Sequence, residues 1–230
     1  MSQVLAINGG NKEIDYEFSG YSTIAKEEAA AVANVMQSGV LSDFVGAPGL
    51  NFLGGTKVKE FEAAFTKKFD CGNSISVNSW TSGLTTIVGA LGIEPGDEVI
   101  VTPWTMCASA SSILHWNAIP VFADIESKTY NLDPISIEKN ITKYTKAIMV
   151  ADIFGHSANM KEIMKIAKNN NLKVISDTAQ SPGAFYKGKY AGTLADVGGF
   201  SLNYHKHIHT GEGGIIVTND DLIAENCRLI

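Results

Sequence analysis

The sequence predicts an α/β fold in which a mostly parallel sheet is flanked by helices. Short runs rich in Val and Ile alternate with stretches of helical spacing along most of the chain. Apolar residues make up 45 % of the 230 residues and charged residues 18 %, a composition that excludes a disordered chain. The predicted strands are 74–77, 98–102, 119–123, 147–151, 172–176 and 214–218, and the segment 197–201 is interpreted as a further strand.

The N-terminal part is expected to be less regular. Residues 1–22 are predicted to form an extended segment, and Thr23 is predicted to cap the helix that follows. Glu27 and Glu28 lie in the first turn of that helix, where acidic side chains suit the positive helix end. The glycine-rich stretch 42–55 is predicted to be a long loop.

The remaining helices follow from apolar spacing and end signals. One amphipathic helix is indicated by apolar residues at i, i+3, i+7 and i+11, namely Val58, Phe61, Phe65 and Phe69. Further helices are expected at 81–91, 107–116, 134–140 and 160–169, and from about 220 to the end. Asp133 and Pro134 supply a cap and a first-turn proline. Asn159 with Glu162 predicts a capping box.

Composition also narrows the function classes. The net charge is −6 and Arg228 is the only arginine, which disfavours a nucleic-acid reader. No apolar run reaches the ~20 residues of a membrane span, and residues 1–10 lack the features of a signal peptide. Cys71, Cys107 and Cys227 are odd in number and widely spaced, which favours a reducing cytoplasm over a disulfide framework.

Two local motifs are interpreted as structural rather than functional. Residues 183–189 nearly match a phosphate loop, but Tyr190 stands where that loop has Ser or Thr, so a turn is predicted. His205, His207 and His209 alternate as metal ligands do, yet no acidic or cysteine partner lies nearby in the sequence. We therefore predict a polar active-site edge there and no metal site.

Three other features together indicate a pyridoxal 5′-phosphate (PLP) site. Residues 78–84 follow a strand and open a helix with hydroxyl side chains, which suits a phosphate group. Asp177 lies at the end of a buried strand, and Lys206 lies between two histidines before a glycine-rich turn. Each alone also fits an ordinary capped helix, a capping Asp or a solvated lysine. Together they match the phosphate, ring nitrogen and aldehyde of PLP.

From about residue 20 onward the chain resembles the DegT/DnrJ/EryC1/StrS family of PLP-dependent sugar aminotransferases. The segments that carry the resemblance are 96–101, 120–125, 145–148, 177–180, 200–201 and 210–214. The resemblance implies the large domain of the PLP-dependent transferase fold type I over residues 23–230. It also implies that a C-terminal small domain is absent, because family members are much longer and this chain stops inside a helix.

The resemblance assigns roles residue by residue. Lys206 matches the lysine that forms the internal aldimine and moves protons, and Asp177 matches the acid paired with the pyridine nitrogen. Gln180 matches the residue near the cofactor's 3-hydroxyl. Thr81 and Ser82 match the pair that binds the phosphate.

Two further positions complete the expected cofactor site. Ser201 matches a second hydroxyl on the phosphate. Met106 stands where the family has an aromatic residue that stacks on the cofactor ring, directly after Thr105. Trp104, two residues earlier, is an alternative for that stacking role, and the sequence leaves the choice open.

The implied reaction transfers an amino group, with glutamate as the donor, to a nucleotide-linked keto-sugar. The resemblance also implies a homodimer, while the cysteines, the charge and the apolar pattern favour a cytoplasmic protein with no nucleic-acid or membrane partner. Related sugar dehydratases carry histidine at the lysine position, so Lys206 favours transamination. The alternatives are a PLP-dependent sugar dehydratase and a catalytically incomplete PLP-binding fragment.

Overall fold

The computed structural model describes residues 4–17 and 23–230 and forms two units, Met1–Leu41 and Ser42–Ile230. The first unit contains a short 3-10 helix, η1 (Ala6–Asn8), within the segment expected to be extended, and helix α1 (Lys26–Ser38). The predicted cap by Thr23 is wrong, because α1 begins at Lys26, two residues later than a cap at Thr23 would place its start. Its N-cap is Ala25, whose backbone N–H donates to the Glu28 carboxylate at 2.7 Å. Residues 18–22 of the predicted extended segment lie outside the described residues.

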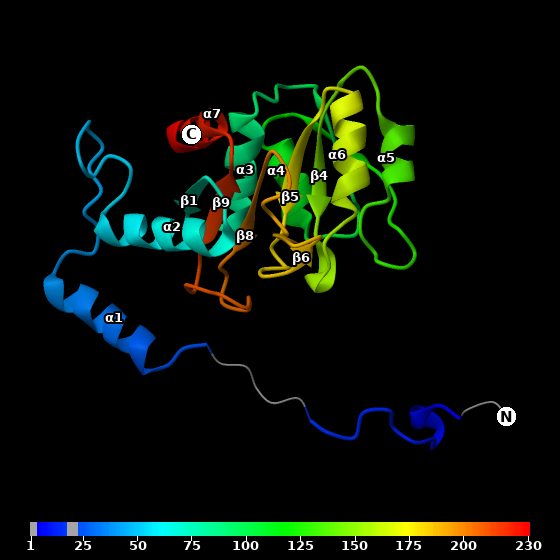
Figure 1. Cartoon of the computed structure of the whole chain (residues 1–230), viewed down its shortest axis with the longest axis horizontal. Helices are drawn as coiled ribbons and strands as arrows, with labels where there is room; N and C mark the ends of the chain where they lie inside the picture. Colours follow the sequence, from blue (N-terminus) through cyan, green and yellow to red (C-terminus); the bar gives the residue numbers. More distant parts are fainter. Residues whose placement is uncertain (1–3, 18–22) are drawn as a thin grey trace. The chain divides into compact units, whose positions relative to one another are not determined.

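The second unit is built on a seven-stranded sheet in the order β1-β9-β8-β5-β4-β2-β3 (Figure 1). Its strands are β1 (Asn73–Val77), β2 (Glu98–Val101), β3 (Ile119–Phe122), β4 (Thr145–Ala151), β5 (Lys173–Asp177), β8 (Val197–Ser201) and β9 (Gly214–Thr218). β8, β5, β4, β2 and β3 pair in parallel, while β9 is antiparallel to both of its neighbours. The predicted α/β class with a mostly parallel sheet is confirmed.

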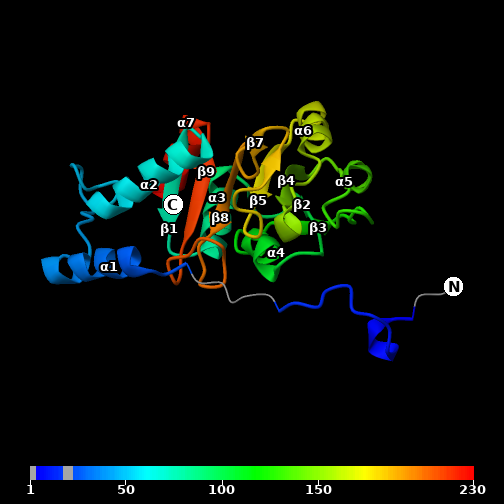
Figure 2. The same ribbon diagram turned by 60° about the horizontal axis from the view of Figure 1, so that its bottom comes forward.

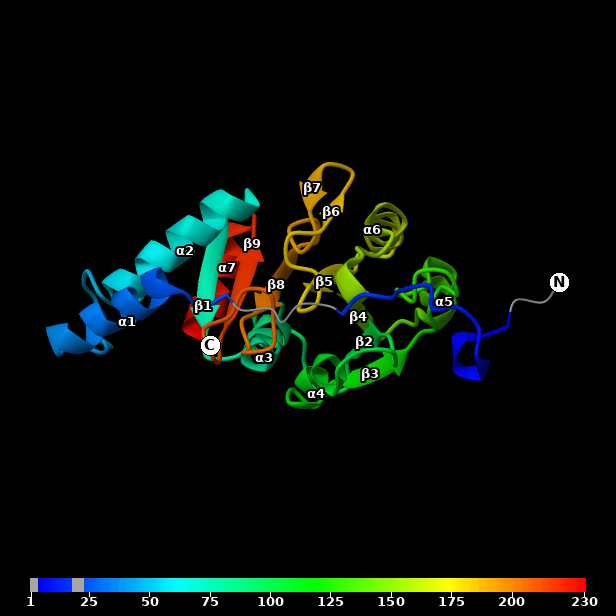
Figure 3. The ribbon, with the colours of Figure 1, turned by 90° about the horizontal axis from the view of Figure 1, so that it is seen from below.

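Helices cover both faces of the sheet. Their bounds are α2 (Thr56–Phe69), α3 (Trp80–Ala90), α4 (Cys107–Leu114), α5 (Pro134–Asn140), α6 (Met160–Asn169) and α7 (Asp221–Leu229), with a 3-10 turn η2 (Ile153–Gly155). Seen from below, α3 and α4 lie on one side of the sheet and α2, α5 and α6 on the other (Figure 3). Two large apolar clusters bury the strands from these two sides. Within the described ranges, no helix combines the length and apolarity that a bilayer crossing requires.

Most element ends agree with the sequence prediction, but the cap at Asn159, like the one at Thr23, does not. Asp133 caps α5 by accepting from the Ile135 N–H at 3.0 Å, as predicted. The capping box at Asn159 is wrong, because that side chain makes no cap bond and instead accepts from the Tyr186 hydroxyl at 2.9 Å. The Asn159 side chain therefore bonds to Tyr186, which is distant in sequence, instead of to a backbone N–H in the first turn of α6.

The near-match to a phosphate loop is a hairpin turn. β6 (Phe185–Tyr186) pairs antiparallel with β7 (Lys189–Tyr190), and the two residues between them have φ of 51° and 82°. Left-handed φ at both central positions is typical of a tight hairpin turn. The interpretation of 183–189 as a turn is confirmed.

Helix α2 packs on β1, β8 and β9 through its aromatic face. Phe65 and Phe69 stack with ring centroids 4.2 Å apart, and Phe69 also packs on Phe200 of β8 at 4.7 Å. α2 lies along β1 and β9 in Figure 2, on the face that holds these rings. This aromatic packing holds β8 in place, and the parallel strands bring their carboxyl ends to one edge of the sheet.

Candidate active site

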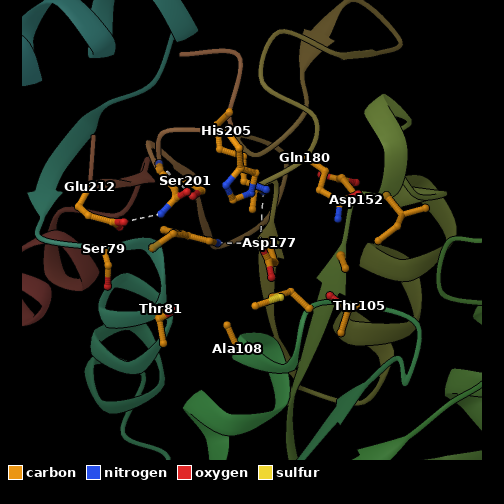
Figure 4. A pocket seen from close by; sticks show the side chains of 18 residues that line it. Ser79, Thr81, Thr105, Ala108, Asp152, Asp177, Gln180, Ser201, His205 and Glu212 are labelled. Atoms are coloured by element: carbon orange, nitrogen blue, oxygen red, sulfur yellow. Dashed lines mark hydrogen bonds between the residues drawn. The ribbon is translucent and has the colours of Figure 1, made fainter. Parts of the chain in front are cut away.

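A cavity of about 240 Å³ opens at the carboxyl ends of β4, β5 and β8. The beginnings of α3 and α4 and the segment between β8 and β9 form its other walls. Figure 4 shows Asp177 at the centre, with Ser79 and Thr81 on one side and Gln180 and Asp152 on the other. The carboxyl edge of a parallel sheet is where ligands bind in this architecture.

Asp177 is the last residue of β5 and is 6 % exposed. Its Oδ1 accepts from the Trp80 indole Nε1–H at 2.6 Å, and its Oδ2 accepts from the Ser109 hydroxyl at 2.7 Å. The Ala179 N–H lies 3.3 Å from Oδ1. Both carboxylate oxygens are therefore held by donors from different helices, which satisfies a buried charge and fixes its plane.

Ser109 was not predicted as a site residue. It lies on α4, is completely buried, and its Oγ is 2.9 Å from Thr105 Oγ1 as well as bonded to Asp177. The contact with Asp177 has no local sequence signal, since the two residues are 68 apart, whereas Thr105 lies only four residues before Ser109. The serines on the buried face of the 107–116 segment are the only sequence feature that could have indicated Ser109 as a site residue.

Replacing this serine is expected to destabilise the fold. Ser109→Ala leaves the Asp177 Oδ2 without its hydroxyl donor, and we expect the free energy of unfolding to fall by about 1–3 kcal/mol in urea denaturation. Ser112→Ala is the matched control, because its hydroxyl is equally buried but bonds only to the Ser109 carbonyl one turn away. Equal losses in the two variants would contradict a special role for the carboxylate contact.

Lys206 lies in the segment between β8 and β9 and lines the same cavity. Its backbone N–H donates to the Asn203 carbonyl at 2.9 Å, and the Leu202 N–H donates to the Gly213 carbonyl at 2.9 Å. These bonds hold the segment over the sheet edge. Burial lowers the pKa of the Lys206 ammonium below its ordinary value, and the nearby negative charge of Asp177 opposes that shift. A neutral amine is the form that attacks a carbonyl carbon.

The lowered pKa of Lys206 predicts an unusual pH profile of amine reactivity. Because burial disfavours the charged form, the neutral amine is populated at lower pH than on an exposed lysine. In competitive labelling of the cofactor-free chain with acetic anhydride, we expect the half-maximal rate of Lys206 at a lower pH than that of exposed Lys168. Asp177→Asn removes the opposing charge and should move the Lys206 midpoint lower still. A Lys206 midpoint at or above that of Lys168 would refute this.

The start of α3 offers hydroxyls and free backbone N–H groups to the cavity. Ser79 is the N-cap, and its Oγ accepts from the Ser82 N–H at 3.1 Å. Ser79 and Thr81 line the cavity. Ser82, the other predicted phosphate residue, lies outside the described lining, and its Oγ is 3.0 Å from that of Ser79. Ser79 and Thr81 therefore face the cavity at this helix start, while the Ser82 N–H and hydroxyl bond to the cap residue Ser79.

The other predicted cofactor residues are brought to the same cavity. Gln180, Ser201 and Met106 all line it. The Gln180 side-chain oxygen accepts from the Phe154 N–H at 3.0 Å, which orients the amide. Trp104, the alternative to Met106 for stacking, lies outside the described lining and packs near Tyr130 with centroids 6.3 Å apart.

A buried carboxyl group underlies the site and was not predicted. Asp152 follows β4 and is 1 % exposed. Its Oδ2 accepts from the hydroxyls of Ser176 at 3.1 Å and Thr178 at 2.8 Å, and its Oδ1 accepts from the Ala158 N–H. Burial raises the pKa of this carboxyl group, and the charge of Asp177 raises it further. The network ties the end of β4 to the end of β5 beside Asp177, whose backbone carbonyl accepts from the Asp152 N–H at 3.0 Å.

The three alternating histidines do not gather around one point. His205 lines the cavity, and its ring meets that of Tyr204 edge-on, with centroids 5.3 Å apart. In the ranges that the structure describes, no group of three or more His, Cys, Asp or Glu side chains is arranged to hold a metal ion. The polar edge expected at 205–209 is thus present at His205.

The chain is similar to curated proteins and to solved structures. GDP-perosamine synthase from Caulobacter vibrioides is 43 % identical over 176 residues, which cover 76 % of this chain and 47 % of that protein. The crystal structure of the aminotransferase from Psychrobacter cryohalolentis is 36 % identical with a TM-score of 0.84, covering 92 % of this chain and 51 % of that one.

A dehydratase is also among the similar structures. The E. coli GDP-4-keto-6-deoxy-D-mannose-3-dehydratase with bound hydrated PLP is 30 % identical with a TM-score of 0.80 and covers 89 % of this chain and 51 % of that one. The chain spans about half the length of the curated relatives it matches. The family model matches residues 22–230. Because the family model covers nearly the whole chain and the similar proteins agree with it, the chain belongs to the DegT/DnrJ/EryC1/StrS aminotransferase family.

Proposed function

We propose that this chain is the PLP-binding part of an aminotransferase that transfers an amino group from glutamate to a keto group on a nucleotide-linked sugar. Residues 23–230 are its large domain in this proposal. The observation that carries the proposal is the joint placement of Asp177, Lys206 and the start of α3 around one cavity. The proposal includes a homodimer, and the three free cysteines support a cytoplasmic location.

The residues of the cavity fit PLP by their chemistry. Ser79 and Thr81 offer hydroxyl and backbone donors for a phosphate group. Asp177 offers a carboxylate, already held on both oxygens, for a protonated ring nitrogen. Lys206 offers a half-buried amine of lowered pKa for the carbonyl carbon. When bound, PLP supplies an electron-withdrawing ring that stabilises negative charge at the substrate carbon.

The chain's own residues then have definite tasks. Lys206 would hold the cofactor through its carbonyl carbon, and its Nζ, once the donor amine had displaced it from that carbon, would take the proton from the carbon that bears the amino group. Asp177 keeps a proton on the ring nitrogen through its fixed negative charge. Ser201, Gln180 and Met106 also line the cavity: Ser201 would add a hydroxyl for the phosphate, Gln180 an amide for the ring's 3-hydroxyl, and Met106 a polarisable sulfur for one ring face.

A sugar dehydratase is the second candidate, because the similar structures include such an enzyme. In the family, the lysine position carries histidine in those dehydratases. This chain has Lys206 there, with His205 also lining the cavity. The lysine amine favours amino-group transfer, and a PLP-binding fragment without turnover is the remaining alternative.

The donor half of the reaction tests the proposal without any sugar. We expect PLP to give the purified chain a visible absorbance band, and glutamate to bleach that band and yield 2-oxoglutarate. D-Glutamate is the matched control and should leave the band unchanged. A stable band with every amino donor would support the inert fragment, and no band at all would contradict PLP binding.

A further inference from the structure

Trp80 is a buried aromatic residue at the cavity that the proposed reaction does not use. It is the first residue of α3, is 5 % exposed, and lines the cavity. Its indole Nε1–H donates to Asp177 Oδ1 at 2.6 Å, across 97 residues of sequence. This bond joins a large ring to the carboxylate that the proposed function assigns to the cofactor's ring nitrogen.

Glycines make the room that the indole occupies. A Cβ on Gly83 would lie 2.7 Å from Trp80 Cε3, and a Cβ on Gly199 of β8 would overlap the ring and the Ile215 carbonyl. A Cβ on Gly214 of β9 would lie 2.7 Å from the Trp80 backbone nitrogen. None of these three glycines has positive φ. Their lack of a side chain is therefore explained by the close approach of Trp80 rather than by backbone conformation.

The indole is one of two side-chain donors that hold the two oxygens of the Asp177 carboxylate. Trp80 from α3 donates to Oδ1, and Ser109 from α4 donates to Oδ2 at 2.7 Å. Because the indole nitrogen only donates and never accepts, this contact holds one geometry and favours the charged acceptor. Oδ1 also accepts from the Ala179 N–H at 3.3 Å, so Oδ2, which accepts only from Ser109 among the described residues, keeps a lone pair for another donor.

We propose that Trp80 is a positioning residue whose indole N–H holds Asp177 in the orientation that meets the ring nitrogen of the cofactor. This inference rests on the proposed function. It goes beyond that function by adding a residue that acts through Asp177, without assigning it contact with the reacting atoms. The glycine-lined slot supplies rigidity, because the ring has no space in which to turn.

Indole N–H resonances of the cofactor-free chain test the contact itself. The sequence has three tryptophans, so three indole signals are expected in a ¹⁵N–¹H spectrum. Trp80→Phe identifies the Trp80 signal, and a short bond to a carboxylate should place it downfield of the other two. Asp177→Asn should move that signal upfield and leave those of Trp104 and Trp116 in place. A Trp80 signal unaffected by Asp177→Asn overturns the proposal.

The affinity of the chain for PLP tests whether the Trp80–Asp177 hydrogen bond contributes to cofactor binding. Trp80→Phe keeps most of the ring but loses the donor, and we expect the Kd for PLP to rise about tenfold, the effect of losing a charge-assisted hydrogen bond. Trp116→Phe is the matched control, because its Nε1–H also donates at 2.7 Å, but to the Thr85 carbonyl. That variant should stay within about twofold of the wild type.

The outcomes separate this inference from the proposed function. Circular dichroism establishes that each variant is folded, and where Trp80→Phe fails to fold, Trp104→Phe and Trp116→Phe identify the Trp80 indole signal of the wild type by elimination. A wild-type chain that binds no PLP contradicts the proposed function and the inference together. A wild-type chain that binds PLP, with an unchanged Kd in Trp80→Phe, contradicts the inference alone.

Discussion

Lys206→Ala is expected to reduce amino-group transfer by about 10²–10⁴-fold, because the amine that binds the cofactor and moves the proton is lost. The visible band of PLP bound to the chain should disappear as well. The measurements are an absorbance titration with PLP and the yield of 2-oxoglutarate from glutamate.

Lys168→Ala is the matched control for this variant. Lys168 is an exposed residue on α6 and lies outside the described cavity lining, so its loss should leave both readouts unchanged. Full transfer activity in Lys206→Ala, or equal losses in the two variants, would refute the role given to Lys206.

Asp177→Asn has the second largest expected effect. The substitution keeps the side-chain shape but removes the negative charge, so the ring nitrogen is no longer held protonated, and amino-group transfer should fall about 10²-fold or more. In the wild type, Trp80 and Ser109 each donate to one oxygen of the carboxylate. An amide has only one oxygen, so its NH₂ group would face one of these two donors. The free energy of unfolding should fall by about 1–3 kcal/mol in urea.

Asp133→Asn provides the comparison for Asp177→Asn. Asp133 caps α5 at 3.0 Å, and asparagine caps helices as well as aspartate does, so stability and transfer should both persist. A transfer rate in Asp177→Asn within twofold of the wild type would show that the carboxylate has no part in the reaction.

The strands of the seven-stranded sheet were predictable because each has its own local signal. Gly214–Thr218 agrees residue for residue with the predicted run, and the Asp177 strand was displaced by one residue. Apolar, β-branched runs between helical segments mark buried strands whatever their neighbours. Such a run does not encode its direction, which is why the antiparallel orientation of β9 was not predicted.

Contacts between distant residues were not predictable in the same way. Asn159 has a cap residue's sequence pattern, but the Tyr186 hydroxyl occupies its side chain. Trp80 and Ser109 meet at Asp177 only because α3 and α4 pack on the same side of the sheet. Lys206 and Asp177 were selected together from their chemistry, and the structure brings both to one cavity. Residue types thus indicated the site, while tertiary packing determines the partners that hold it.

Reduction of the PLP-treated chain with sodium borohydride, followed by peptide mapping, tests the central claim most directly. The reagent fixes any link between PLP and an amine, and the chain offers 17 lysines, since Arg228 is the only arginine among its 18 Lys and Arg residues. We predict one phosphopyridoxyl group per chain, on Lys206. Label spread over exposed lysines, or a chain without label at Lys206, would contradict the account.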